Sequence, residues 1–423
     1  MTSIRRVVVL GGNGVMGAGA GALFAGVGLP TVLLARTIEK AETGKARAEK
    51  LAKRELPITC GTYDDLAQAL RDADFVLESV AEDLETKRGL FATIDRIPNH
   101  AIVATVSSGL SIAAMCEGRS ERFRSHFLGV HLFNPPTVIT GCELIAHRET
   151  ACDVVEAVRE LLITTCGRQV VECADTPGFA GNRLGFKVLN EVAQLAEQHG
   201  VAFMDSLLGT HTGRALPPLA TIDLVGWDVH KAIVDHLHAQ TGDVAFALPA
   251  YVQRGIDRGH LGRKTRDKGG FFRVDADKRQ FVLDPASGDY QPRAEVAPAC
   301  KLVERMQAAA KTGRYASGLE ILCTADGLEA EILRRVLLGY ISYGLGLVGE
   351  VVAAPRDIDR IMGYGFNWAP PSVLVDAIGA GRTIALLDDA GLAVPPAIVA
   401  AARANTAMFD EPLDGARFFA TAA

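Results

Sequence analysis

Residues 7–17 read VVVLGGNGVMG, and this stretch decides the fold of the first part of the chain. Val7–Leu10 is a short apolar run typical of a buried strand, and three glycines follow it with the spacing Gly-x-Gly-x-x-Gly. Such glycines allow a tight turn, close approach of a pyrophosphate to the backbone, and packing of the next helix on the strand. We therefore expect a dinucleotide site here; the alternative is a glycine-rich turn without a ligand. The expected cofactor-binding residues of the loop are Gly12, Asn13, Gly14, Val15, Met16 and Gly17.

Apolar runs and helical patterns alternate through the first part of the chain. The runs are 7–10, 31–34, 75–77, 101–105, 128–131 and 169–171, and the helical patterns are 16–27, 39–51, 84–96 and 153–164. This alternation predicts a parallel sheet with helices on both faces, the Rossmann type of α/β domain. Asp175-Thr176-Pro177-Gly178 ends the pattern, and residues 182–198 read as one long helix that leads into a second domain.

The second half of the chain contains an approximate repeat. The first copy has Asp-x-x-Leu-Gly from Asp205, Pro-Pro from Pro217 and Asp-x-x-Gly from Asp223. The second copy has related motifs in the same order, from Asp359, Pro370 and Asp376. The spacing agrees within one residue, which favours a tandem duplication of a helical domain over chance similarity. Residues 283–298 have the composition of a linker or hairpin. The predicted organisation is a Rossmann-type domain over 1–178 and two tandem all-α domains over 179–290 and 291–423.

Composition and charge limit the class of protein. The chain has 423 residues, 48% hydrophobic and 22% charged, with a formal net charge of −6. These values indicate a globular protein and argue against nucleic-acid or membrane-surface binding. No apolar run approaches the ~20 residues of a membrane span, and the early strand leaves no room for a signal peptide. Eight cysteines without a Cys-x-x-Cys motif indicate reduced thiols, a cytoplasmic location and no metal site.

The end of the second predicted strand bears on the choice of cofactor. An acidic residue normally binds the ribose 2′-OH of NAD at this point, whereas an arginine suits the 2′-phosphate of NADP. This chain has Ala35 and Arg36 there. The chemistry of the two residues favours NADP. The alternative is that Arg36 stacks on the adenine or points to solvent while NAD binds.

Three polar positions stand out as candidates for catalysis. Ser107 and Ser108 follow a predicted strand and so lie at the carboxyl edge of the sheet, where ligands bind. His131 precedes an Asn-Pro-Pro turn, and Glu143 follows twelve residues later. The turn can return the chain so that Glu143 faces His131, as a general base for alcohol oxidation requires. The alternative is a structural histidine in an apolar run.

Several motifs, in order along the chain, resemble those of the 3-hydroxyacyl-CoA dehydrogenase family. They are the nucleotide loop over 12–19, Glu78-Ser-Val-Ala-Glu82 with Lys87, Val106-Ser-Ser-Gly-Leu110, His131–Pro135 with Glu143, Asp175-Thr-Pro-Gly-Phe-Ala-Gly-Asn182-Arg183, and Leu261-Gly-Arg-Lys264-Thr265 followed by Gly270-Phe271. The tandem helical domains are similar to those of the long bacterial members. Those members usually carry a hydratase domain as well, and nothing in this chain resembles one.

The resemblance implies an NAD(P)-dependent enzyme that interconverts a (3S)-3-hydroxyacyl-CoA and a 3-oxoacyl-CoA. It implies that His131 is the general base, that Glu143 orients it, that Ser108 binds the substrate oxygen and that Asn182 holds the substrate. Family membership favours NAD, whereas Ala35 and Arg36 at the end of the second predicted strand favour NADP. The further cofactor contacts that the resemblance implies are Glu82, Lys87, Ser108, Asn134 and Lys264.

The chain also departs from the family pattern. Val106 stands where the family has an asparagine, and Ala35 stands where it has the ribose acid. Two other functions therefore stay open: a dehydrogenase of a CoA-free 3-hydroxy acid, and a nucleotide-binding scaffold with weak or no catalysis. Family members with one helical domain form dimers in which these domains pair between two chains. The two tandem copies of this chain could pair with each other instead, which favours a monomer; a homodimer is the alternative.

Overall fold

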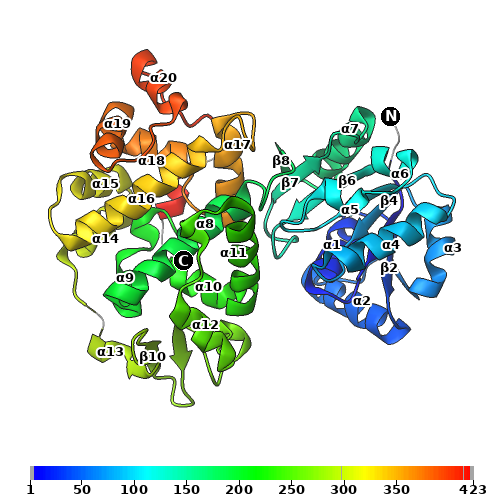
Figure 1. Cartoon of the computed structure of the whole chain (residues 1–423), viewed down its shortest axis with the longest axis horizontal. Helices are drawn as coiled ribbons and strands as arrows, with labels where there is room; N and C mark the ends of the chain where they lie inside the picture. The colour runs from blue at the N-terminus through cyan, green and yellow to red at the C-terminus, as the bar shows by residue number, and fades with distance from the viewer. Residues whose placement is uncertain (1–3, 297, 413, 420–423) are drawn as a thin grey trace. The chain divides into compact units, whose positions relative to one another are not determined.

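The computed structural model describes residues 4–296, 298–412 and 414–419. The chain forms two compact units (Figure 1). The first comprises the described residues up to Ala180 together with Glu350–Ala353, and the second comprises Gly181–Gly349 and the described residues from Ala354 onward. The short return segment is tied to the first unit by the Ala174 N–H, which donates to the Val351 carbonyl at 2.8 Å.

The first unit is built on an eight-stranded sheet in the order β3-β2-β1-β4-β5-β6-β7-β8. Its strands are β1 (Val7–Leu10), β2 (Thr31–Ala35), β3 (Ile58–Thr62), β4 (Phe75–Glu78), β5 (Ile102–Thr105), β6 (Phe127–Leu132), β7 (Gly141–Ala146) and β8 (Gln169–Cys173). The central strands are buried along their whole length, as expected of parallel strands covered on both faces. Every neighbouring pair is parallel except β6 and β7, which are antiparallel.

Helices connect these strands and cover the sheet (Figure 1). They are α1 (Val15–Gly26), α2 (Ile38–Ala52), α3 (Leu66–Arg71), α4 (Leu84–Arg96), α5 (Ile112–Cys116), α6 (Glu121–Ser125) and α7 (Cys152–Glu160). Side-chain caps set several of their starts: the Thr37 hydroxyl accepts the Lys40 N–H at the start of α2, and the Asp83 carboxylate accepts the Thr86 N–H at 2.8 Å at the start of α4.

The predicted Rossmann-type class is confirmed, and two strands differ from the sequence expectation. β3 contains Thr59, Gly61 and Thr62 and lies at the sheet edge, so it lacks a continuous apolar run. β7 follows the Asn-Pro-Pro turn and pairs back on β6, so the sheet is not parallel throughout. A strand joined to its neighbour by so short a turn can pair only in the antiparallel direction.

The second unit is mainly helical. Its first set of helices is α8 (Gly181–His199), α9 (Val201–Leu207), α10 (Pro218–Val225), α11 (Trp227–Thr241) and α12 (Ala250–Asp257). A three-stranded antiparallel sheet follows, formed by β9 (Phe272–Val274), β10 (Gln280–Leu283) and β11 (Tyr290–Pro292). The remaining helices are α13 (Arg293–Val296), α14 (Lys301–Lys311), α15 (Tyr315–Thr324), α16 (Leu328–Gly346), α17 (Pro355–Arg360), α18 (Pro371–Ile378), α19 (Ala380–Asp389) and α20 (Pro396–Ala404).

The two sets of helices share local structure at the repeated motifs. The Asp223 carboxylate accepts two consecutive backbone N–H groups, those of Phe271 and Phe272, each at 2.9 Å. Asp376, 153 residues later, accepts those of Met408 and Phe409 at 2.8 and 3.0 Å. The glycines that follow α10 and α18 also adopt the same left-handed backbone, with φ of 102° and 94°. The repeated Asp-x-x-Gly motif therefore performs the same structural task twice.

Among the described residues, no helix combines the length and apolarity that crossing a bilayer requires.

Candidate active site

The glycine loop joins β1 to α1 and leaves no space for side chains at two of its positions. Gly11 has a φ of 77°, and a Cβ atom there would lie 2.6 Å from the Ser79 carbonyl oxygen. A Cβ atom on Gly17 would lie 2.4 Å from the Gly11 carbonyl oxygen. Both approaches exclude any residue larger than glycine, so α1 packs directly against the loop.

The amino end of α1 suits the phosphates of a dinucleotide. Gly14 precedes the helix in an extended conformation and supplies no side-chain cap, and the first turn of α1 contains no acidic residue. Its N–H groups can therefore bind an anion, aided by the helix dipole. The Arg47 guanidinium, on α2, donates to the Asn13 carbonyl at 3.3 Å and adds positive charge to this end of the loop. The residues present fit a dinucleotide cofactor.

The end of β2 carries a positive charge and no carboxylate. Ala35 is buried, Arg36 is exposed, and Thr37 caps α2. Nearby, the Tyr63 hydroxyl accepts the Gly11 N–H at 3.1 Å, and burial raises the pKa of this tyrosine. A ribose 2′-OH would find no acidic partner among residues 35–37, whereas a 2′-phosphate would find the Arg36 guanidinium in this segment.

The carboxyl ends of β4 and β5 are held together by a buried ionic cluster. The Lys87 ammonium is fully buried and lies 2.8 and 2.9 Å from the two Glu78 oxygens and 3.3 Å from Glu82. The Thr105 hydroxyl donates to Glu78 at 2.6 Å. Lys87 thus pairs with two carboxylates at this edge of the sheet, and its contact with the cofactor stays a prediction.

Glu82 also organises the loop after β5. One of its oxygens accepts the Ser107 hydroxyl at 2.5 Å and the Ser108 backbone N–H at 2.8 Å. The Ser107 oxygen in turn accepts the Leu110 N–H at 3.2 Å. Val106, by contrast, is buried in the core of the first unit, and its N–H donates to the Glu78 carbonyl. The turn that carries Ser108 is therefore fixed by Glu82.

His131 and Glu143 are register partners on β6 and β7, and their side chains meet (Figure 1 shows the two strands side by side). His131 Nδ1 lies 2.5 Å from Glu143 Oε2, with 4% of the histidine and none of the glutamate exposed. The imidazole packs against the rings of Phe133 and Phe179 at centroid distances of 4.9 and 5.9 Å. Because a carboxylate only accepts hydrogen bonds, the Nδ1 proton points to Glu143 and leaves Nε2 as the basic nitrogen.

The other carboxylate oxygen of Glu143 is held as well. Its Oε1 accepts the Ala180 N–H at 2.9 Å and the Cys173 thiol at 3.5 Å. Neither donor was given this role from the sequence, although Ala180 lies within the motif over 175–183. The thiol could be anticipated only from the pairing of β8 with β7, which aligns Cys173 with Ile145, two residues past Glu143. The glutamate is thereby fixed on both oxygens.

Of the remaining predicted residues, Asn134 is exposed just after β6. Asn182 and Lys264 belong to the second unit: Asn182 is buried in the first turn of α8, and the Lys264 ammonium pairs with Asp228 at 2.7 Å. Glu78 and Thr105 are two polar groups that the sequence analysis did not assign to the site. Glu78 could have been found from its place at the carboxyl end of a buried strand.

Two family descriptions match the chain. Residues 6–176 match "3-hydroxyacyl-CoA dehydrogenase, NAD binding domain", and residues 178–271 match "3-hydroxyacyl-CoA dehydrogenase, C-terminal domain".

Individual proteins also resemble it. A probable 3-hydroxyacyl-CoA dehydrogenase of Deinococcus radiodurans is 32% identical over 65% of this chain and 84% of its own length. A probable 3-hydroxyacyl-CoA dehydrogenase of Bacillus subtilis is 29% identical over 93% of this chain, which spans about half (53%) of that relative. A crystal structure of a 3-hydroxybutyryl-CoA dehydrogenase from Escherichia coli has a TM-score of 0.70 at 22% identity and covers 95% of this chain and 99% of its own, a likeness of fold.

Proposed function

The chain belongs to the 3-hydroxyacyl-CoA dehydrogenase family, and we propose that it interconverts a (3S)-3-hydroxyacyl-CoA and the corresponding 3-oxoacyl-CoA with a nicotinamide cofactor. The observation that carries the proposal is the buried pair of His131 Nδ1 and Glu143 Oε2, 2.5 Å apart. A histidine in this setting has a fixed tautomer and a counter-charge for its protonated form.

Each residue then has a defined task. His131 Nε2 takes the proton of the C3 hydroxyl during oxidation and returns it during reduction. Glu143 stabilises the imidazolium that forms, and the Ser108 hydroxyl donates a hydrogen bond to the C3 oxygen. The nicotinamide, when bound, accepts or supplies the hydride at C3. We assign substrate positioning to Asn182, on α8.

The cofactor would lie along the glycine loop. We propose that its phosphates bind at the amino end of α1 and that its nicotinamide half contacts Glu82, Lys87, Ser108 and Asn134, with Lys264 contributing from the second unit. We further propose a preference for NADP, since Arg36 offers a guanidinium where Ala35 offers no acid.

The helical part bears on assembly. The matching carboxylate contacts of Asp223 and Asp376 support two tandem domains, over 179–290 and 291–423. We propose that these pair within one chain and that the protein is a monomer. All eight cysteines are free thiols, which agrees with a reducing compartment such as the cytoplasm.

Reduction of acetoacetyl-CoA tests the function. Loss of nicotinamide absorbance is followed with NADH and NADPH side by side, and acetoacetate serves as the CoA-free substrate. We expect turnover of acetoacetyl-CoA, faster with NADPH at equal subsaturating concentration. Cofactor binding without turnover of the thioester would contradict the proposal, and turnover of acetoacetate alone would indicate a CoA-free substrate.

A further inference from the structure

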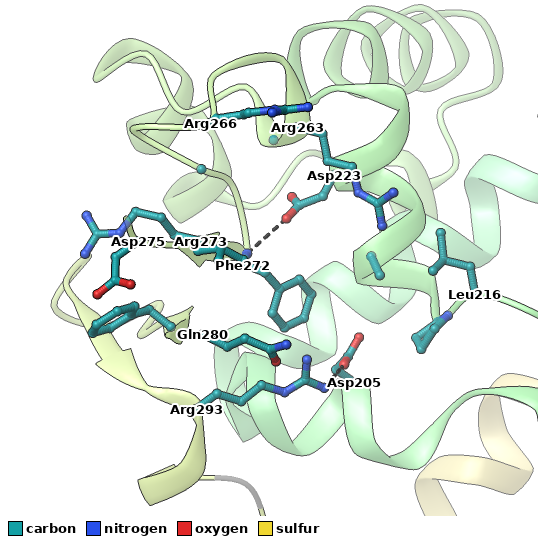
Figure 2. Close-up of a pocket in the computed structure, with 16 residues that line it drawn as sticks. Asp205, Leu216, Asp223, Arg263, Arg266, Phe272, Arg273, Asp275, Gln280 and Arg293 are labelled. Carbon is teal, nitrogen blue, oxygen red and sulfur yellow. Dashed lines mark hydrogen bonds and ion pairs between the residues drawn. The ribbon is translucent and has the colours of Figure 1, made fainter. Parts of the chain in front are cut away.

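The second unit contains a cavity of about 760 Å³ at its small sheet (Figure 2). It is bounded by α9, by α10 and the segment before it, by the loop from Gly262 to Gly269, by the strands β9 and β10, and by Arg293 at the start of α13. None of the residues assigned above to catalysis or cofactor binding lines it. The volume is within the range of sites for small organic ligands.

Three arginines on this cavity have no carboxylate partner. The guanidinium groups of Arg263, Arg266 and Arg273 line it, and among the described residues none of them forms a side-chain hydrogen bond or ion pair. Arg273 stacks instead over the rings of Phe281 and Tyr290, at 5.2 and 4.4 Å. With Arg293 the lining holds four arginines against three aspartates, and this excess of positive charge favours an anion.

The nearby carboxylates are committed elsewhere. Asp223 accepts the Phe271 and Phe272 N–H groups and the Trp227 indole N–H at 2.7 Å; Figure 2 marks its bond to Phe272. Asp275 accepts the Arg279 guanidinium at 2.7 Å and the Arg279 backbone N–H at 2.9 Å. Neither carboxylate forms a hydrogen bond or ion pair with the three arginines among the described residues, although the charge of Arg263 opposes the rise in pKa that burial causes in Asp223.

The opposite side of the cavity offers an acceptor. Asp205 Oδ2 pairs with Arg293 at 2.8 Å, whereas Asp205 Oδ1 is buried and has no partner among the described residues. Burial raises the pKa of Asp205 to about 6, so at neutral pH this oxygen is mostly that of an ionised carboxylate. It can accept a hydrogen bond from a ligand hydroxyl or amino group.

From these groups we propose that the cavity is a second ligand site, for a small phosphate monoester that carries a hydroxyl donor, such as a sugar phosphate or a nucleotide. The phosphate dianion meets the guanidinium groups of Arg263 and Arg266, which both come from the loop from Gly262 to Gly269, because a phosphate offers enough oxygens and charge for two arginines where a carboxylate serves one. A hydroxyl at the other end of the ligand donates to Asp205, and Phe272 provides an apolar wall.

Titration calorimetry of the full chain tests the proposal with ribose 5-phosphate, which carries both groups. The variant is Arg263→Gln with Arg266→Gln; both side chains are exposed, and neither forms a hydrogen bond or ion pair among the described residues. The matched control is Arg305→Gln, an exposed arginine on α14 without an ion pair among the described residues. We expect binding by the wild type and the control, and weakening by about tenfold or more in the double variant. Fluorescence of bound reduced cofactor should be the same in all three proteins.

Two further probes examine the two ends of the ligand. Inorganic phosphate should compete but bind more weakly than ribose 5-phosphate, and ribose should not bind measurably. An unchanged isotherm in the double variant would place the binding elsewhere and overturn the proposal. So would the absence of binding to the wild type, or equal affinity for inorganic phosphate and ribose 5-phosphate.

Discussion

His131 Nδ1 and Glu143 Oε2 lie 2.5 Å apart on two antiparallel strands in which the two residues are direct register partners. The pairing of β6 with β7 sets this distance, so the orientation of the imidazole is a property of the sheet. Two more donors fix the second oxygen of Glu143, the Ala180 N–H and the Cys173 thiol. The carboxylate therefore has little freedom to turn away from the histidine.

Replacement of Glu143 by Gln should lower kcat by about 100-fold or more. The amide keeps the shape of the side chain but removes the counter-charge for the imidazolium, and it can donate to Nδ1 and impose the other tautomer. The rate of acetoacetyl-CoA reduction under saturating cofactor measures this. Glu55→Gln, at an exposed glutamate of the same unit, is the control. A Glu143→Gln rate within a few-fold of the wild type would contradict the role of Glu143.

Replacement of Cys173 by Ala should lower kcat roughly fivefold with little change of KM. The loss of one neutral hydrogen bond to Glu143 corresponds to about 1 kcal/mol. Cys173→Ser should recover most of the rate, because its hydroxyl can donate to the same oxygen. A purely packing role predicts the reverse, with Ala tolerated and the buried Ser harmful, and the comparison of the two variants decides between them.

Replacement of Arg36 by Ala should raise KM for NADPH by roughly tenfold and leave KM for NADH nearly unchanged. The expected loss is that of one charge-assisted hydrogen bond to the 2′-phosphate. Lys50→Ala removes an equal charge from the exposed end of α2 and should leave both constants alone. Equal effects of Arg36→Ala on the two cofactors would show that Arg36 does not read the 2′-phosphate.

Stability should depend on pH through Asp359. Burial raises its pKa from the ordinary value of 3.8 to about 7. The folded protein thus binds this proton more tightly than the unfolded chain, and the free energy of unfolding falls as the pH rises from about 4 to about 7. Asp359→Asn avoids the buried charge and should be more stable than the wild type at pH 8, and this advantage should be smaller at pH 5 by on the order of 2 kcal/mol.

Urea unfolding at pH 5 and pH 8 measures this difference, with the exposed Asp326→Asn as control. Asp205 and Asp223 also have pKa values raised to about 6 by burial, so part of the pH dependence should remain in the variant. If the variant and the wild type differ in free energy of unfolding by the same amount at both pH values, titration of Asp359 is not the cause of that difference.

Much of the first unit could be predicted because its signals are local. The run of Val7–Leu10 before the glycine loop indicates a strand, a turn and a helix within twenty residues, and β1 and α1 occupy those positions. β3 and β7 escaped prediction for physical reasons. β3 is an edge strand and lacks the buried, continuous apolar pattern of the central strands. β7 is buried, but Gly141 and Glu143 interrupt its apolar residues.

The contacts of the candidate site were harder to predict. The enclosure of Lys87 by Glu78 and Glu82 depends on how the loop after β4 turns the chain into α4. The thiol donation from Cys173 to Glu143 depends on which strands are neighbours. The cavity of the second unit gathers its arginines from a loop, a strand and a short helix that lie up to thirty residues apart. No periodicity or motif in the sequence brings such groups together.

The most direct test of the account compares the wild type with His131→Ala in the reduction of acetoacetyl-CoA, with the affinity for the reduced cofactor measured in parallel. General-base catalysis contributes about 10²–10⁴-fold. If His131 is the general base, kcat falls by a factor in that range and the cofactor affinity is unchanged. A His131→Ala protein that turns over acetoacetyl-CoA at close to the wild-type rate would contradict this role.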